Sequence, residues 1–207
     1  MLGQTNIRVK PNKKKPPINY IEYIESTGTQ YIDTEINADY KLSIKADMQF
    51  LETSGYRMSG TIAVTNETTT RHQFMYYDYE KGITYWYGTN EKYVKLITGN
   101  LTERYTFDID IYNKKIRINE GSYTDISYSN FDTQLNYVVF ARNASGEVGN
   151  FSKIRLYSLQ LYYDGTLVKD FKPCKDEAGT YCLYDEVEKR YYYNQGTGEF
   201  TGGVSIW

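Results

Sequence analysis

Short apolar segments separated by turn residues fill the chain after residue 17. Stretches rich in Tyr, Ile, Val, Thr and Phe alternate with Gly, Asn and Asp, which is typical of β-strands joined by tight turns. In residues 105–111 apolar and polar positions alternate, as they do in a strand with one face in the core and one in water. The same criteria predict strands at 20–24, 30–36, 43–51, 57–64, 72–77, 83–87, 93–97, 105–111, 115–119, 137–141, 153–163 and 166–171.

Two tight turns are predicted from residue type. Asp164-Gly165 suits a two-residue type I′ hairpin turn. Asn113-Lys114 is typical of a second turn, in which we expect Asn113 to take the positive φ. No window keeps the apolar spacing of a helix, and no fixed-period repeat occurs. Regularly spaced strands predict one all-β domain, a sandwich or a barrel, over residues 18–207.

Composition excludes several protein classes. With 40% hydrophobic and 16% aromatic residues, the 207-residue chain is too apolar to be wholly disordered. It is long enough to bury a core without disulfides. No apolar run approaches the ~20 residues of a membrane helix, and the first residues lack the apolar region of a secretory signal. A single His and two Cys argue against the usual zinc sites.

Residues 1–17 differ in charge from the rest. They contain no acidic residue and end in Pro16-Pro17, while the remaining chain is net acidic, which argues against nucleic-acid specificity. We expect a short, flexible N-terminal arm that docks onto other proteins of a larger assembly; contact with nucleic acid or an anionic surface is the alternative. Its basic residues are Arg8, Lys10, Lys13, Lys14 and Lys15.

Two stretches near the chain ends carry a family likeness. They are YIEYIESTGTQYIDT at 20–34 and NFSKIRLYSLQLYYDGTLVKDFKPC at 150–174, continued by the short motifs at 183–185, 192–194 and 196–202. These residues resemble the concanavalin A-like lectin/glucanase (laminin-G-like) domains of phage structural proteins and of surface proteins of gut bacteria. The resemblance covers about residues 18–203. It implies a two-sheet antiparallel jelly-roll β-sandwich whose first and last segments are neighbours, with ligand specificity in the middle of the chain.

The glucanase branch of that superfamily uses paired carboxylates in an E-x-D-x-x-E pattern. The nearest match, Asp108-Ile-Asp110-Ile-Tyr-Asn113, lacks both glutamates, so a polar strand face is expected in place of a glycosidase site. The acidic run at 185–188 fails the spacing and is expected in a turn. Any Ser-His or Cys-His scheme would need His72, and no G-x-S-x-G, P-loop or dinucleotide motif occurs. We therefore expect a protein that is not an enzyme, with His72 as a partly exposed packing or hydrogen-bonding residue.

Cofactor chemistry is not indicated either. Cys174 and Cys182 flank the turn at 176–179 and could pair across a hairpin, but we expect reduced thiols in buried positions. Some relatives in the superfamily bind Ca²⁺, yet no D-x-D-x-D-G loop is present and no calcium site is predicted.

The excess of tyrosine, 24 residues, is the most informative feature. In residues 83–88, Tyr85 and Tyr87 share a face with Ile83 that should look into the core, which leaves Trp86 with Thr84 on the outer or concave face. Outward rings can stack on sugars or anchor a protein interface, and tyrosine also fills strands without any such role. Replacing Trp86 should barely affect folding. The candidate glycan-binding residues are Trp86, Tyr77, Tyr79, His72 and Asn90.

The function expected from these features is a non-catalytic phage virion protein of the tail, baseplate or head decoration, made in the host cytoplasm. Its arm would contact other virion proteins and its lectin-like domain would bind host-surface glycans or decorate the particle. A domain of a bacterial cell-surface adhesin, and a purely structural virion protein that binds no sugar, are the alternatives. In each case the protein is expected to be oligomeric or part of a larger assembly. A glycan-cleaving enzyme is disfavoured.

Overall fold

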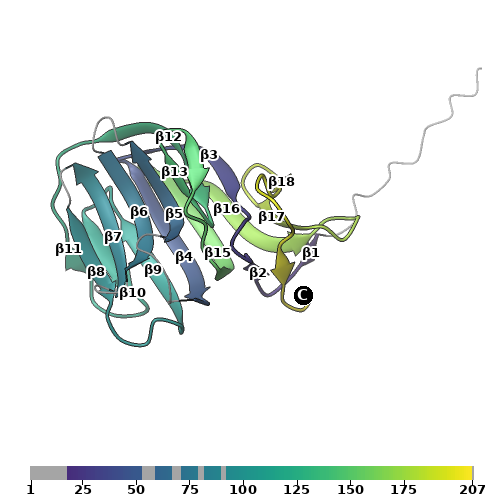
Figure 1. Ribbon diagram of the computed structural model, residues 1–207. Helices are drawn as coiled ribbons and strands as arrows, with labels where there is room; N and C mark the ends of the chain where they lie inside the picture. Colours follow the sequence, from purple (N-terminus) through teal and green to yellow (C-terminus); the bar gives the residue numbers. More distant parts are fainter. Residues whose placement is uncertain (1–17, 53–58, 67–70, 79–81, 90–91, 207) are drawn as a thin grey trace, which may run out of the picture.

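The computed structural model describes residues 18–52, 59–66, 71–78, 82–89 and 92–206 (Figure 1). Within these ranges the chain forms β-strands and no helix. The strands assemble into two sheets that pack face to face, an all-β sandwich compatible with a jelly roll, so the predicted fold class is confirmed. The expected arm, with Arg8 and its four lysines, lies outside the described residues, as do Tyr79 and Asn90.

Sheet I contains segments from both ends of the described chain. Its main path runs β11-β10-β9-β4-β15-β16-β17-β18, with β1 on β16 and β2 between β15 and β19. The strands are β1 (Asn19–Tyr20), β2 (Ile24–Glu25), β4 (Leu42–Phe50), β9 (Arg104–Asp110), β10 (Lys115–Ile118), β11 (Thr124–Asp125), β15 (Ile154–Tyr163), β16 (Thr166–Lys175), β17 (Tyr181–Asp185), β18 (Arg190–Tyr192) and β19 (Thr201–Gly202).

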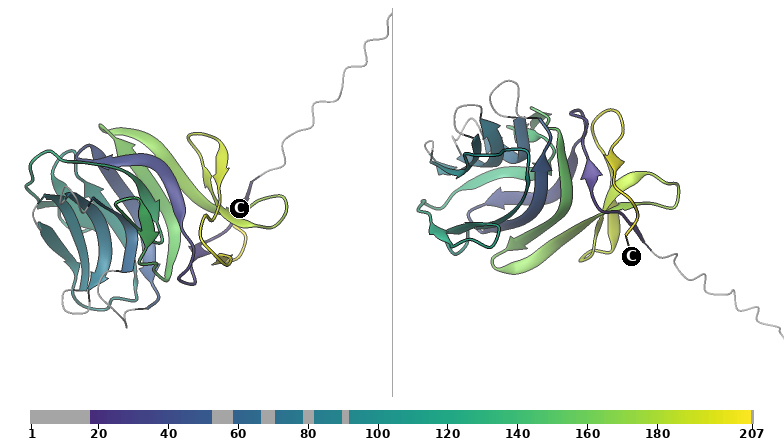
Figure 2. Two further views of the ribbon diagram at one scale, coloured as in Figure 1. Left: turned by 45° about the horizontal axis from the view of Figure 1, so that its top comes forward. Right: turned by 90° about the horizontal axis from the view of Figure 1, so that it is seen from below.

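Sheet II is built mostly from the middle of the chain. Its path is β14-β13-β5-β6-β7-β8, and β12 pairs with both β5 and β3. Figure 2 shows the two layers from two further directions. The strands are β3 (Ile32–Asp39), β5 (Ser59–Asn66), β6 (Arg71–Asp78), β7 (Gly82–Thr89), β8 (Tyr93–Ile97), β12 (Asp132–Val139), β13 (Arg142–Ala144) and β14 (Glu147–Gly149).

The core lies between the two sheets and follows the alternation seen in the sequence. Phe107 and Ile109 of β9 are buried in it, whereas Thr106 and Asp108 belong to the opposite face. A hydrogen bond crosses the core between the two sheets. The buried Gln73 of β6 donates through its Nε2 to the carbonyl oxygen of Leu42 in β4, at 2.6 Å. Polar groups in such an interior need a partner of this kind.

Both predicted turns occur, and one differs in detail. Asp164 and Gly165 have φ values of 52° and 77°, as a type I′ turn requires. In the other turn Lys114, not Asn113, takes the left-handed conformation, with φ of 59°. The Asn113 side chain instead donates to Asp110 Oδ2 at 2.9 Å, which closes the turn without a positive φ at that residue.

The bounds of β16 differ from prediction around a proline. The strand predicted at 166–171 continues to Lys175 through Pro173, which lacks the N–H that a central strand needs. This is tolerated because β15 pairs with β16 only as far as Phe171. Beyond that point the Pro173 carbonyl still accepts a hydrogen bond from the amide of Ile21 at 3.0 Å.

The two end motifs are neighbours in sheet I, as the resemblance implied. Tyr20 of β1 lies opposite Cys174 of β16, and Glu25 of β2 lies between Arg155 of β15 and Thr201 of β19. In Figure 1 the β17–β18 region and the C-terminus therefore lie at one end of the molecule, while β7, β8 and β11 lie at the other. In the part of the chain that is described, no helix is long and apolar enough to cross a membrane.

Candidate functional site: an aromatic surface on β6, β7 and β8

The two faces of β7 separate as their alternation predicts. Ile83, Tyr85 and Tyr87 lie in the core between the sheets. Trp86 lies on the opposite face, where it packs against Tyr76. Burial raises the pKa of Tyr85 well above its ordinary value, as expected of a phenol removed from water.

Among the described side chains, four aromatic ones gather on that opposite face: His72, Tyr76, Trp86 and Tyr93, here called the Trp86 cluster. The rings of Trp86 and Tyr93 are stacked, with centroids 5.9 Å apart and planes 20° apart. Tyr76 meets Trp86 edge-on at 5.9 Å, and His72 does so at 5.8 Å. These are the separations at which aromatic pairs attract each other beyond simple burial.

Strand pairing brings the cluster together. Trp86 of β7 lies directly opposite Tyr93 of β8, and His72 of β6 lies opposite Gly88. The Trp86 indole, two residues from Gly88 on the same strand, contacts the imidazole of His72. Tyr76 is buried, Trp86 and His72 are partly buried, and Tyr93 is 42% exposed. Tyr93 therefore presents the most accessible ring of the cluster.

The structure places the sequence candidates in different environments. His72 and Trp86 are together in the cluster. Tyr77 is only 8% exposed and lies in the core, because it pairs with Ile83 and shares that residue's face; this removes Tyr77 from the candidate surface. Of Tyr79 and Asn90 nothing is described. Tyr93 and Tyr76 were not among the residues predicted from the sequence. Alternation within β6 and β8 could show which face each tyrosine occupies, but not the strand register that brings both rings to Trp86.

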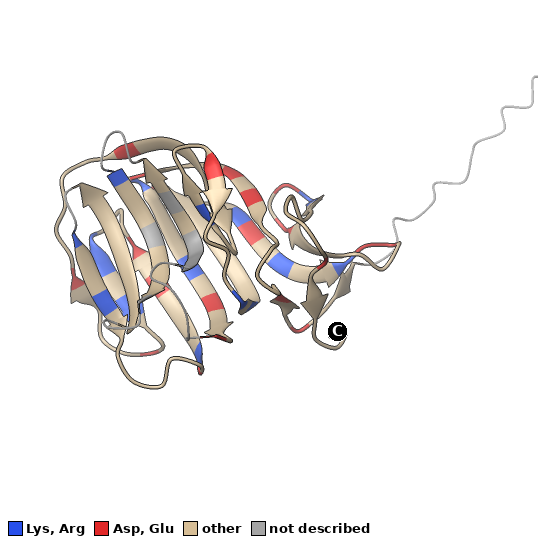
Figure 3. Cartoon of the chain, viewed as in Figure 1, with Lys and Arg blue, Asp and Glu red and all other residues tan. Residues whose placement is uncertain are grey.

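The surface of β6 and β7 is short of charge. β7 carries no charged residue, and β6 carries Arg71 and Asp78 only at its two ends (Figure 3). β8 adds the exposed Lys95, which lies opposite Thr84. An aromatic surface with so few charges suits a neutral ligand with C–H faces, such as a sugar ring, better than a charged one. The Trp86 cluster can therefore offer stacking and a few polar ring atoms, but no general acid or base pair.

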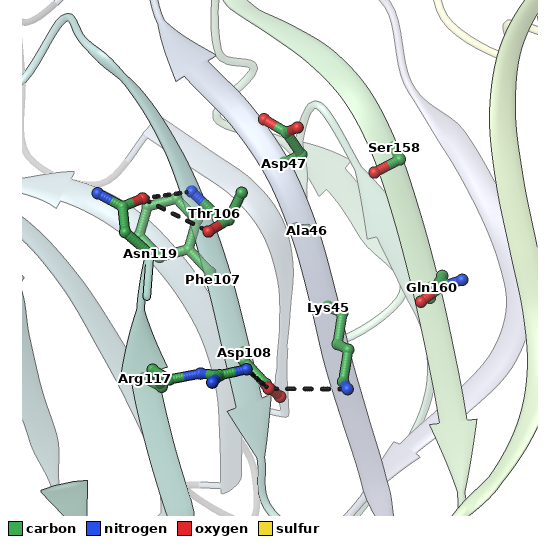
Figure 4. A pocket seen from close by; sticks show the side chains of 10 residues that line it. All are labelled: Lys45, Ala46, Asp47, Thr106, Phe107, Asp108, Arg117, Asn119, Ser158 and Gln160. Atoms are coloured by element: carbon green, nitrogen blue, oxygen red, sulfur yellow. Dashed lines mark hydrogen bonds and ion pairs between the residues drawn. The ribbon is translucent and has the colours of Figure 1, made fainter. Parts of the chain in front are cut away.

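A hollow lies on the outer face of sheet I (Figure 4). Its volume is about 220 Å³, and its lining residues come from β4, β9, β10 and β15, with Asn119 directly after β10. Asp108 lines it and accepts hydrogen bonds from Arg117 Nη2 at 3.0 Å and Tyr123 Oη at 2.7 Å. Lys45 Nζ lies 3.7 Å from the same carboxylate.

The charges of this hollow are largely paired with one another. Asp47 holds Arg104 through two hydrogen bonds of 2.8 and 2.7 Å. The hydrogen bond to Asp108, together with burial, raises the pKa of Tyr123 above its ordinary value. Asp110 instead accepts from the backbone and side chain of Asn113. Both strand aspartates thus serve as hydrogen-bond acceptors that fix their neighbours.

Neither a candidate metal site nor a known protein family indicates a function for the described residues. Among the described residues no group of three or more His, Cys, Asp or Glu side chains could hold a metal ion. The chain matches no protein-family model and no curated protein. The sandwich and the Trp86 cluster are therefore the features of this chain that bear on its function.

Proposed function

We propose that this protein is a non-catalytic, lectin-like module of a phage particle, of the concanavalin A-like jelly-roll type, in the tail, baseplate or head decoration. Its Trp86 cluster binds a glycan of the host surface. The observation that supports this most is the stacked pair of Trp86 and Tyr93 on a face with little charge, with Tyr93 42% exposed. Such rings suit sugar binding, because pyranose C–H groups can stack on them.

A structural role in the particle is the second candidate, and the same pair of rings favours it. Tyrosine and tryptophan are enriched at the centres of protein interfaces, where an apolar ring with a polar tip is buried by the partner. In that case the Trp86 cluster packs on another particle protein and binds no sugar. If the chain is instead a domain of a bacterial surface adhesin, the Trp86 cluster would also bind a glycan, and the domain would belong to a cell-surface protein in place of a phage particle.

Glycan binding by the purified chain separates these functions. We expect binding on an array of host cell-wall polysaccharides and oligosaccharides, followed by titration of the strongest glycan. Tyr93→Ala should weaken it about tenfold or more, since one stacking contact contributes ~1–3 kcal/mol by analogy with nucleobases. Tyr112→Ala is the matched control, because Tyr112 is 45% exposed and lies in the turn after β9.

Two results would contradict the lectin proposal. One is the absence of binding to any glycan on the array by the folded protein, which favours the structural role. The other is binding that is equally strong in wild type and Tyr93→Ala, which would place the sugar elsewhere.

A further inference from the structure

The two end motifs lie against each other and form one rigid loop system. Gln30 is fully buried, and its Nε2 donates to the carbonyl of Glu199 at 3.1 Å. Its Oε1 accepts from the amide of Thr27 at 2.9 Å, so both ends of the side-chain amide are in use. Residues 26–31 are thereby joined to residues 194–200.

Asn194 holds the same loop from within. Its Oδ1 accepts from the amides of Gly196 at 2.8 Å and Tyr31 at 3.2 Å, and its Nδ2 donates to the carbonyl of Gly198 at 2.9 Å. Gly196 lies so close to the other segment that a Cβ atom there would be 2.2 Å from the carbonyl oxygen of Thr29. The loop is therefore fixed before any ligand arrives, which lowers the entropy cost of binding.

This loop lines a pocket of about 520 Å³, within the range of small-ligand sites. The remaining lining comes from the turn at 178–180 and from two tyrosines, Tyr181 and Tyr193. Tyr193 is 43% exposed, and its hydroxyl donates to Asp176 Oδ2 at 3.1 Å, which fixes the ring. Among the described lining residues Glu199 is the charged one, and its side chain makes no described hydrogen bond or ion pair.

We propose that this pocket binds the terminal pyranose of a neutral glycan. Tyr181 and Tyr193 supply aromatic faces for the C–H side of the sugar, and the free carboxylate of Glu199 accepts from its hydroxyls. Lys175 Nζ lies over the Tyr181 ring, 4.4 Å from its centroid, so Tyr193 offers the more open ring. Asp176 is also close to the pocket, and the two carboxylates outnumber this one ammonium group, which disfavours an acidic sugar. Binding here is independent of the Trp86 cluster, which lies in the β6–β8 sheet while the pocket adjoins β17 and β18 (Figure 1).

Backbone-amide NMR titration of the full chain tests the proposal. The probes are the methyl glycosides of glucose, galactose and N-acetylglucosamine, with methyl glucuronide as the acidic comparison. We expect at least one neutral glycoside to shift amides in residues 178–181 and 193–200, and methyl glucuronide to leave them unchanged. Tyr193→Ala should remove these shifts, and Glu199→Gln should weaken binding about tenfold. Trp86→Ala and Tyr112→Ala should leave them as in wild type.

Several results would overturn the proposal. The first is the absence of shifts in both segments with every neutral glycoside, whether or not amides of β6–β8 respond. The second is equal binding of the glucuronide. The third is binding that persists unchanged in the folded Glu199→Gln and Tyr193→Ala variants. Loss of binding in Trp86→Ala alone supports the Trp86 cluster and contradicts this pocket.

Discussion

The ammonium nitrogen of Lys169 lies 2.5 Å from a carboxylate oxygen of Glu188, although Lys169 is only 1% exposed. Asp185, which is fully buried, lies 3.7 Å from the same nitrogen, and the hydroxyl of Tyr192 is also in contact with it. A buried ammonium group is stable only with such partners. The contacts tie β16 to the turn between β17 and β18.

Acid should weaken this arrangement. Desolvation raises the pKa of Glu188, but hydrogen bonds from Lys169, Tyr192 and Arg190 together lower it to about 2. An unfolded glutamate has a pKa of about 4.3, so the unfolded state binds the proton more readily. The contribution of Glu188 to stability is therefore present above about pH 4.3 and is lost as the pH falls toward about 2.

Urea unfolding over a pH series measures this effect. In Glu188→Gln the free energy of unfolding should fall less steeply than in wild type over that window. Parallel curves for the two proteins would show that Glu188 has an ordinary pKa in the folded state.

The packing of Trp86 changes the expectation for its removal. The sequence suggested an outward ring whose loss barely affects folding, but the structure shows a partly buried indole in contact with Tyr76, His72 and Tyr93. We expect Trp86→Ala to lower the free energy of unfolding by about 1–3 kcal/mol, below the range for a fully buried tryptophan. Denaturant unfolding tests this, with Tyr93→Ala as the milder comparison. Unchanged stability would mean that the rings do not pack in solution.

The aspartates of β9 are predicted to support structure and not hydrolysis. No release of reducing ends from β-glucans or host cell-wall polysaccharide is expected. Asp108→Asn should cost about 1 kcal/mol of stability, because Arg117 and Tyr123 lose a charged acceptor. Polysaccharide cleavage that disappears when Asp108 and Asp110 are replaced would contradict this.

The N-terminal arm is predicted to act in assembly. Deleting residues 1–17 should change the melting temperature by no more than about 1–2 °C, since few buried contacts should be lost. The same deletion should abolish incorporation into the parent particle. A large drop in melting temperature would show that the arm belongs to the sandwich.

The two cysteines should be unreactive in the folded protein. Their sulfur atoms lie 3.4 Å apart on directly opposed positions of β16 and β17, and both side chains are buried as free thiols. The contact with Cys182 and burial raise the pKa of Cys174, which removes the nucleophilic thiolate. A thiol reagent should modify Cys174 and Cys182 only after unfolding. Rapid labelling of the native protein, or a mass two hydrogens lower, would contradict this.

The alternation of apolar and polar residues predicted which face of a strand is buried. The order and register in which distant strands pair could not be predicted from that pattern. The faces of β7 follow from alternation alone, so the opposite orientations of Tyr85 and Trp86 were predictable. Tyr77 was assigned to the wrong surface because its face depends on pairing with Ile83. The stacking of Tyr93 on Trp86 likewise needs the order and register of β7 and β8, which no single strand encodes.

The pairing of the first and last strands also governs how the chain can fold during synthesis. Ile21 and Ile24 are 1% and 0% exposed. Their partners in sheet I all come after residue 150: Ile21 pairs with Ser205, and β2, which contains Ile24, pairs with β15 and β19. On the ribosome these two side chains remain uncovered while most of the protein is made. Contacts of such long sequence separation slow folding and prolong the exposure of apolar surface to chaperones. β1 and β2 are thus translated well before their partner strands and are among the last of the described strands to be buried.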